Sequence, residues 1–168
     1  MKWIRVSFYI TFVILIAGFL TGCTKNSSET AASGLPETAA GDLPEVVVYL
    51  PATCQCCYDW VTYLQENGFP VSATNEKDMA AIKTKLGVDL SLRSNHTAVV
   101  EGYVIEGHVS VEDIVRLLQE RPAITGLAVP GMPGGTPGME RMLSKIPYAP
   151  YDVIAFTESG RRYTFSQH

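Results

Sequence analysis

The residues from 43 onward predict a single α/β domain with a mixed sheet, and three observations support this prediction. Short β-branched runs alternate with segments whose apolar residues recur at helical spacing, as in strand–helix units. Two later runs are joined by a tight turn, which makes part of the sheet antiparallel. The length, about 125 residues, suits one ordinary domain with one hydrophobic core.

The first strand–helix unit begins at Val46–Leu50, an apolar and largely β-branched run that is typical of a buried strand. Pro51–Cys57 follows it as a loop. A helix should come next, because the apolar residues between Trp60 and Leu64 fall on one helical face. Asn67-Gly68 then supplies a stop signal. The unit therefore places a cysteine-rich loop at the start of a helix.

The second strand–helix unit follows directly. Phe69–Ala73 is predicted to form a short strand, and Asn75 can cap the helix after it. The apolar residues of that helix recur at i, i+3 and i+7, and they are Met79, Ile82 and Leu86. Two strand–helix units therefore open the domain.

The next segment is predicted to form a tight hairpin and a helix. Thr97–Val100 and Tyr103–Ile105 are the strands, and Glu101-Gly102 is the turn. Ser110 begins a capping box that is weak because Asp113 replaces the usual Glu. The helix that this box opens is expected to continue as far as residue 120.

The predicted order of elements, β-α-β-α-β-β-α, matches the thioredoxin fold, an α/β sandwich with a mixed sheet. A last hairpin lies beyond it, with strands Tyr151–Phe156 and Arg162–Phe165 around a turn at Glu158–Gly160. The predicted fold is therefore a thioredoxin-like sandwich over residues 43–168 that ends in a C-terminal β-hairpin.

The amino terminus has the anatomy of a secretory signal peptide. Two basic residues precede an apolar run, Val6–Leu20, which is shorter than the roughly 20 residues that a spanning helix needs. Leu20-Thr-Gly-Cys23 resembles a bacterial lipobox, in which the cysteine is lipidated and the chain is cut before it. Residues 1–22 are therefore predicted to be a lipoprotein signal peptide. Residues 23–42 are polar and lack apolar periodicity, which predicts a flexible tether.

These segments predict a location and exclude one class of partner. Acyl chains on Cys23 would anchor the mature chain to membrane lipid, at about 0.8 kcal/mol per buried methylene. We expect an extracytoplasmic, membrane-anchored lipoprotein on the periplasmic face. Thr24 favours the outer membrane in a Gram-negative host, because the Asp that signals inner-membrane retention is absent. The formal net charge is −4 and no basic cluster is present, which excludes nucleic acid as a partner.

The candidate chemistry lies in three closely spaced cysteines, Cys54, Cys56 and Cys57. The dipole and free N–H groups of a helix N-terminus stabilise thiolates, so we expect the thiol pKa values to fall below about 8.5. A compact group of soft thiolates favours Cu(I), with Zn as the second candidate. Three other interpretations stay open: a structural disulfide between Cys54 and Cys57, a catalytic dithiol, and three merely buried cysteines.

Further soft donors are candidates for the same metal site. His96 enters the third predicted strand where thioredoxin-like folds bring a loop against the cysteine motif, and this loop lacks the cis-proline of oxidoreductases. Met132 and Met139 offer thioethers from a loop rich in Gly and Pro. The alternatives are a hydrogen-bonded structural histidine and methionines that only pack. His108 is expected to orient a turn or to support a ligand, and His168 to be mobile and incidental.

Four stretches carry a resemblance to a known family: Thr53–Cys57, Leu92–Ala98, Gly102–Val109, and Gly126–Pro133 continuing to Gly138–Glu140. Between Val46 and about Phe165 the chain resembles the domain of unknown function 411 family, small bacterial proteins described as copper-associated and metal-binding. The resemblance implies a thioredoxin-like fold, export and a metal-linked role near copper-resistance systems, with no established enzymatic activity. The family usually has a cysteine where this chain has Asn95, which excludes a four-thiolate site here.

Two functional hypotheses of different classes follow. In the first, a membrane-anchored protein binds Cu(I) for sequestration, transfer or resistance, has no enzymatic activity, and has a copper-handling protein as its candidate partner. In the second, the chain is a thiol–disulfide oxidoreductase that acts through Cys54 and Cys57. A disulfide-stapled interaction module is a third interpretation. The absent proline and the additional thiol of Cys56 favour the first hypothesis.

Overall fold

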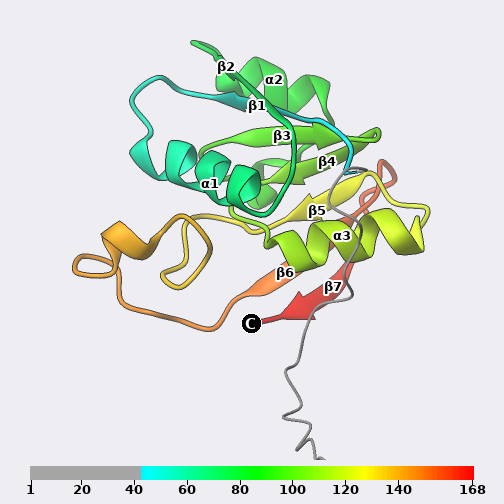
Figure 1. Cartoon of the computed structure of the whole chain (residues 1–168). Coiled ribbons are helices and arrows are strands. Elements are labelled where there is room, and N and C mark those ends of the chain that lie inside the picture. The colour runs from blue at the N-terminus through cyan, green and yellow to red at the C-terminus, as the bar shows by residue number, and fades with distance from the viewer. Residues whose placement is uncertain (1–42) are drawn as a thin grey trace, which may run out of the picture. The chain divides into compact units, whose positions relative to one another are not determined.

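A computed structural model describes residues 43–168 of the chain. The signal peptide, the lipidated Cys23 and the tether expected from the sequence lie outside these residues. Within them the chain forms one seven-stranded mixed sheet with helices on both faces (Figure 1). No helix of the described part is long and apolar enough to cross a membrane.

The elements follow one another in the order expected for a thioredoxin-like domain with an addition at its end. The strands and α-helices are β1 Val46–Leu50, α1 Gln55–Glu66, β2 Val71–Asn75, α2 Met79–Lys85, β3 Thr97–Val100, β4 Tyr103–Glu106, α3 Val111–Glu120, β5 Gly126–Ala128, β6 Asp152–Phe156 and β7 Arg162–Gln167. Two short 3-10 helices, Leu90–Leu92 and Glu140–Met142, complete the list.

The strands are hydrogen-bonded in the order β2-β1-β3-β4-β5-β6-β7. The pairs β1–β2 and β4–β5 are parallel, and the four other pairs are antiparallel. The first four strands and the three α-helices make the predicted thioredoxin-like sandwich, so the fold class is confirmed. The predicted C-terminal hairpin is β6–β7, and β5 joins it to the sheet.

The two faces of the sheet bury different groups, because successive side chains of a strand point to opposite sides. α1 and α3 lie on one face and α2 on the other (Figure 1). The main core lies under α1 and α3, and its fully buried large side chains include Leu50, Trp60, Leu64, Ile105, Ile114, Leu117 and Leu127. A smaller cluster on the other face contains Val88, Leu92, Val104, Ala128 and Phe156.

The structure corrects the predicted second unit. β2 covers Val71–Asn75, so Asn75 ends a strand and does not cap α2. The cap is Asp78, whose carboxylate accepts a hydrogen bond from the Ala81 N–H at 2.9 Å. The predicted apolar stripe of α2 is only half-buried, and the residue of this helix that is buried is Lys83.

Other local predictions are confirmed or extended. The Ser110 hydroxyl accepts a hydrogen bond from the Asp113 N–H at 3.1 Å, so the weak capping box does open α3, which ends at Glu120 as expected. The strand β5 was not predicted, because three residues that begin with a glycine are too short to show an alternating pattern. Gly126 has no space for a side chain, since a Cβ there would lie 1.9 Å from the Val104 carbonyl oxygen.

Candidate metal centre

The thiol cluster, defined as Cys54, Cys56 and Cys57, lies where the chain passes from β1 into α1. The Pro51 carbonyl accepts a hydrogen bond from the Cys54 N–H at 3.0 Å, which turns the chain after the strand. Cys54 is the N-cap of α1, and its carbonyl accepts hydrogen bonds from the next turn, but its side chain caps no backbone group. The sulfur atoms are therefore directed toward one another rather than toward the helix end.

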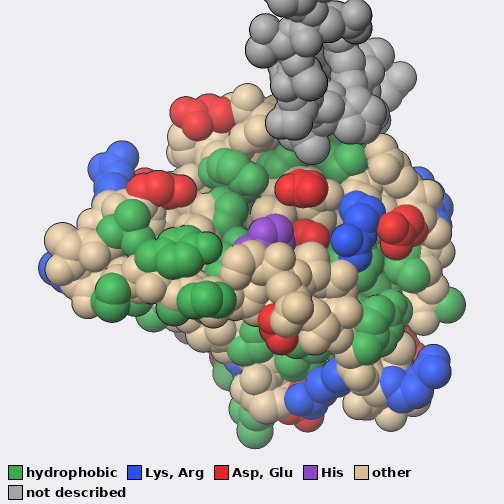
Figure 2. All heavy atoms as spheres, turned by 90° about the horizontal axis from the view of Figure 1, so that it is seen from below, with side chains coloured by type: hydrophobic (Ala, Val, Ile, Leu, Met, Phe, Trp, Pro, Cys, Tyr) green, Lys and Arg blue, Asp and Glu red, His purple; other side chains and the backbone are tan. Residues whose placement is uncertain are grey.

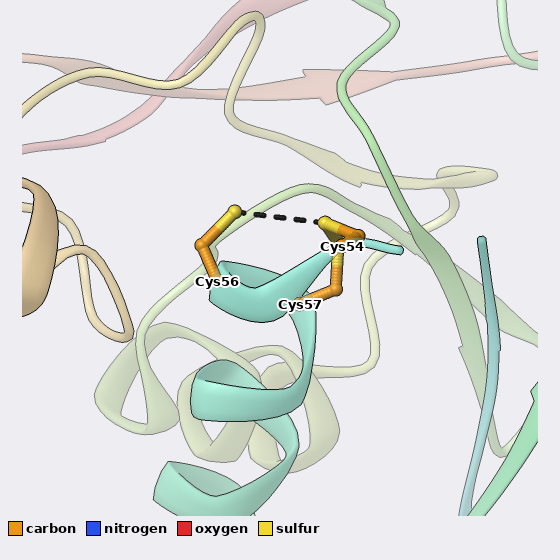
Figure 3. Close-up of side chains that lie close together, drawn as sticks. All are labelled: Cys54, Cys56 and Cys57. Atoms are coloured by element: carbon orange, nitrogen blue, oxygen red, sulfur yellow. Dashed lines mark hydrogen bonds between the residues drawn. A yellow bond between two sulfur atoms is a disulfide. The ribbon is translucent and has the colours of Figure 1, made fainter. Parts of the chain in front are cut away.

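Cys54 and Cys57 form a disulfide, and Cys56 is a free thiol whose Sγ lies 3.6 Å from the Sγ of Cys54 (Figure 3). All three sulfur atoms lie within 4.8 Å of one another. Within residues 43–168 these thiols are the only group of three or more His, Cys, Asp or Glu ligand atoms gathered in this way. The disulfide, left open as one interpretation of the sequence, joins two of the three cysteines predicted as metal ligands.

The environment of Cys56 does not produce the expected low pKa. Burial raises the pKa of the Cys56 thiol above its ordinary value, and the negative charge of Asp59 on α1 raises it further. The backbone N–H groups of Cys56 and Cys57 lower the pKa but are outweighed. The prediction of a depressed pKa is therefore wrong for Cys56, because desolvation exceeds the effect of the helix terminus.

Asn95 connects the thiol cluster to one of the predicted methionines. Its amide Nδ2 lies 3.8 Å from the Sγ of Cys54 and 2.9 Å from the Sδ of Met132. Met132 is 38% exposed, so this side chain is partly at the surface. The structure thus brings Met132 to the thiol cluster, with the Asn95 amide between the two.

Two loops meet at Asn95 and are tied together by the backbone. The Gly131 N–H donates to the Arg93 carbonyl at 3.3 Å, and the Ser94 hydroxyl donates to the Gly131 carbonyl. The Ser94 N–H donates in turn to the buried Glu106 carboxylate at 2.6 Å. These bonds set the position of the Asn95 side chain between the cysteines and Met132.

His96 points into the main core rather than to the surface. Its side chain is fully buried, and its ring centroid lies 4.5 Å from that of Trp60 and 4.9 Å from that of His108. Neither ring nitrogen of His96 has a hydrogen-bond partner. The structure therefore pairs His96 with His108 and does not include it in the close group of sulfur ligands.

His108 and Met139 lie on the same side of the domain. The Nδ1 of His108 is 2.7 Å from the Pro137 carbonyl oxygen, so His108 contacts the Gly- and Pro-rich loop rather than only its own turn. Gly138 in this loop packs on the backbone of Trp60, where a Cβ would lie 2.7 Å from the Trp60 nitrogen. Met139 next to it is fully buried. The two predicted methionines therefore separate, with Met132 at the surface and Met139 in the interior.

Comparison with known proteins places this arrangement in a family. Residues 92–139 match a family model described as a protein of unknown function, DUF411. Two solved structures, titled as forms 1 and 2 of the copper resistance protein CopG, are each 41% identical to this chain. The chain covers 98% and 99% of them, they cover 76% of it, and the TM-scores are 0.69 and 0.70. The chain belongs to the DUF411 family.

A search of curated proteins finds no match to the sequence. The DUF411 match ends at Met139 and begins at Leu92, so it covers Asn95, both buried histidines and both predicted methionines. The thiol cluster lies before the matched segment. The match therefore includes the loops that carry Asn95 and Met132 but not the cysteines.

The segment between β5 and β6, which contains Met132, gives the domain an apolar surface. In the view from below, hydrophobic side chains gather on the left of the molecule, over this segment (Figure 2). Its large exposed apolar side chains are Met132, Leu143 and Tyr148. Apart from the short 3-10 helix, the segment has only an isolated bridge between Gly134 and Tyr148, as expected from its Gly and Pro content.

The sequence analysis did not identify a buried ionic group on the other face of the sheet, which also holds the loop before Asn95 through the hydrogen bond from Ser94 to Glu106. This lysine cluster consists of Lys83, Thr97 and Glu106. The Lys83 ammonium lies 2.6 Å from a Glu106 carboxylate oxygen and donates to the Thr97 hydroxyl at 2.8 Å, and that hydroxyl donates to Glu106 at 2.6 Å. The signal in the sequence was a lysine directly after Ile82, within the apolar pattern of α2.

His168 is also placed differently from the prediction. Its Nε2 lies 2.8 Å from the nearly buried carboxylate of Asp113, and its ring stacks on Tyr151 at 5.0 Å. Main-chain hydrogen bonds in both directions join it to Tyr151. The expectation of a mobile His168 is wrong, because the pairing of β6 and β7 continues to this residue.

Proposed function

We propose that the protein binds Cu(I) as cargo at Cys54, Cys56 and Cys57, with the Met132 thioether as a further donor. Membership of the DUF411 family, the names of the structural relatives and the thiol cluster support a copper-related metal-binding role. The single observation that carries the proposal is the group of three sulfur atoms within 4.8 Å. Soft sulfur donors in a compact group suit a soft cation.

Binding by all three cysteines requires the disulfide to be opened first. A thiol reductant would supply two electrons and two protons to the Cys54–Cys57 bond and would itself become a disulfide. Cu(I) would then replace the protons of the thiols. Burial and Asp59 raise the pKa of Cys56, so metal binding at this thiol would be accompanied by release of its proton.

Location and partners form part of the same proposal. A lipidated Cys23 would hold the domain at the periplasmic face of a membrane, where a copper-handling protein would deliver or collect the ion. Cargo binding needs no enzymatic step. The exposed Met132, beside the buried Cys54, is the donor that an approaching partner would meet first.

The deciding experiment is an anaerobic titration of the full chain in detergent with Cu(I), against a competing chelator. The disulfide is left intact in one sample and reduced with a phosphine, then removed, in the other. We expect the reduced sample to compete strongly and its free thiols to become protected from alkylation. Cys56→Ser should weaken the competition sharply, whereas Thr53→Ser, at the exposed position before Cys54, should not. Equal competition by both samples, with thiols that stay reactive, would overturn the proposal.

A second candidate function is thiol–disulfide exchange, and the observed disulfide favours it specifically. In this case a substrate thiolate would attack Cys54 or Cys57, and the released cysteine would leave as a thiolate. The Cys56→Ser variant separates the two functions. It should retain insulin reduction or thiol oxidation through Cys54 and Cys57 if exchange is the function, and the copper proposal predicts that neither activity is found in the unchanged chain.

A further inference from the structure

The histidine pair, His96 and His108, is an unexplained polar group in the core of the domain. Both side chains are fully buried, and their rings meet edge to face with centroids 4.9 Å apart. Three of their four ring nitrogens have no hydrogen-bond partner: both nitrogens of His96 and the Nε2 of His108. Buried polar atoms are nearly always paired, so three unpartnered nitrogens in two adjacent rings call for a ligand or a water molecule.

The protonation of His108 follows from its one hydrogen bond. The Pro137 carbonyl oxygen, 2.7 Å from Nδ1, can only accept, so Nδ1 carries the proton. The Nε2 of the neutral ring therefore keeps its lone pair. A histidine whose Nδ1–H donates to a backbone carbonyl, with Nε2 free, has the arrangement that holds imidazole ligands on metals.

Burial favours the neutral form of both rings. Burial lowers the pKa of His96 well below its ordinary value, and the neighbouring His108 and the Lys83 ammonium lower it further. Burial also lowers the pKa of His108. A neutral imidazole offers a lone pair, which is the form that binds metals.

The surroundings select the kind of cation. A structural zinc ion usually takes four ligands, and in residues 43–168 no Asp, Glu or Cys joins the histidines to make a group of three. The buried Lys83 ammonium on the opposite face of the sheet also disfavours a second positive charge on the ion. Cu(I) is monovalent, binds imidazole and is stable with two or three ligands.

We propose that His96 and His108 form a second metal site, which binds a soft monovalent cation through imidazole nitrogens without the cysteines. Cys57 and Trp60 lie three residues apart on the buried face of α1, and His96 packs on Trp60. The histidine pair therefore contacts α1 at Trp60, the residue about one helical turn after Cys57. Cu(I) as the natural occupant rests on the proposed function, but the site itself does not.

The test uses a chain in which no free thiol remains. Cys23→Ser and Cys56→Ser are combined in the full chain, and the Cys54–Cys57 disulfide is left oxidised. Ag(I), a redox-stable substitute for Cu(I), is titrated in while the ring nitrogens of all histidines are observed by ¹⁵N NMR. We expect tight binding of a single equivalent, with large shifts at His96 and at the Nε2 of His108 and little change at His168. Absence of these shifts would overturn the inference and leave a buried water as the partner of the nitrogens.

Variants then assign the binding. His96→Leu and His108→Leu should each abolish the binding of the single equivalent of Ag(I). His168→Leu, at the third histidine of the chain, should leave this binding unchanged. If the leucine variants do not fold, the NMR observation on the unchanged histidines decides alone. This test can fail independently of the proposed function. If the reduced chain binds Cu(I) but the chain without free thiols binds no Ag(I), only the histidine site is disproved. If Ag(I) binds to the histidines but the reduced chain binds no Cu(I), only the thiol site is disproved.

Discussion

The lysine cluster and the histidine pair are two buried polar groups on opposite faces of the same two strands. Thr97 and Glu106 project from β3 and β4 toward α2, where Lys83 joins them, and every charged atom finds a partner at 2.6–2.8 Å. His96 and His108 project toward α1 and leave three ring nitrogens unpartnered. Neighbouring positions in the sequence therefore reach very different degrees of hydrogen bonding.

The difference separates a structural role from a binding role. A fully partnered ionic group in the core holds its elements in one arrangement, and removing one member leaves a buried charge alone. An unpartnered pair contributes little to the free energy of unfolding and keeps its lone pairs for something else. We therefore expect stability to depend on the lysine cluster and ligand binding to depend on the histidines.

The largest expected effect is that of Lys83→Met. It leaves the Glu106 carboxylate buried without its partner, and we expect the free energy of unfolding in urea to fall by about 3–5 kcal/mol. The double variant with Glu106→Gln should recover much of the loss, because no charge is then buried. Lys85→Met changes an exposed lysine of the same helix and should cost less than about 0.5 kcal/mol. An equal loss at Lys83 and Lys85 would contradict the structural role of the cluster.

A smaller effect is expected where the loop covers the histidines. Gly138→Ala places a Cβ 2.7 Å from the Trp60 nitrogen, at a positive φ of 81°. Gly160→Ala has the same φ of 81° with open space around it, so it reports the backbone strain alone. We expect Gly138→Ala to cost about 1–3 kcal/mol more than Gly160→Ala in thermal or urea unfolding. Equal costs would mean that the loop moves off Trp60 freely.

In the metal-free chain, replacing the histidines should cost less than replacing the lysine. His96→Leu removes two unpartnered nitrogens, so we expect a change in unfolding free energy below about 1.5 kcal/mol, of either sign. His108→Leu also removes the hydrogen bond to Pro137 and should be the more costly of the two, by about 1 kcal/mol. Urea unfolding after treatment with a chelator measures both. A loss at His96 as large as that at Lys83 would remove the contrast between the two groups.

The smallest effect concerns pH. Burial lowers the pKa of Lys83 below its ordinary 10.5, although Glu106 opposes the shift. Between the lowered pKa and 10.5 the unfolded chain binds more protons at this residue than the folded chain, so this contribution to stability rises with pH. Compared with the Lys83→Met/Glu106→Gln double variant, the unchanged protein should gain stability as the pH approaches 10.5, by at most about 1.4 kcal/mol per pH unit. A relative loss of stability over this range would reverse the sign that we assign to Lys83.

The sequence was sufficient for the fold and for the position of the cysteines, because both depend on local patterns. β-branched runs, the turn at Glu101-Gly102 and the Ser110 cap act over a few residues, and the structure has them all. The prediction that the apolar residues of α2 are its buried face was wrong. The spacing of apolar residues cannot show that Lys83, beside them, pairs with the Glu106 carboxylate 23 positions later. The Lys83–Glu106 pair exists only through the crossing of α2 over β3 and β4.

The candidate site was predictable only in part, for the same reason. Its thiols are adjacent in sequence, whereas Met132 reaches them through Asn95, 37 positions away. The resemblance drew attention to Asn95 as the replacement of a cysteine, but not to the amide that faces both sulfur types. The packing of His96 on Trp60 and the burial of Met139 depend on contacts between distant segments, and no spacing rule contains that information.

The disulfide joins residues only three positions apart, within the first turn of α1. A covalent link over so short a stretch closes a very small loop and restricts the unfolded chain little. Opening it would change which atoms are available for coordination while the sheet and helices stay as they are. The domain would therefore carry its redox state within one buried turn of a helix, where the partly exposed Cys56 is the neighbouring sulfur that another protein could contact.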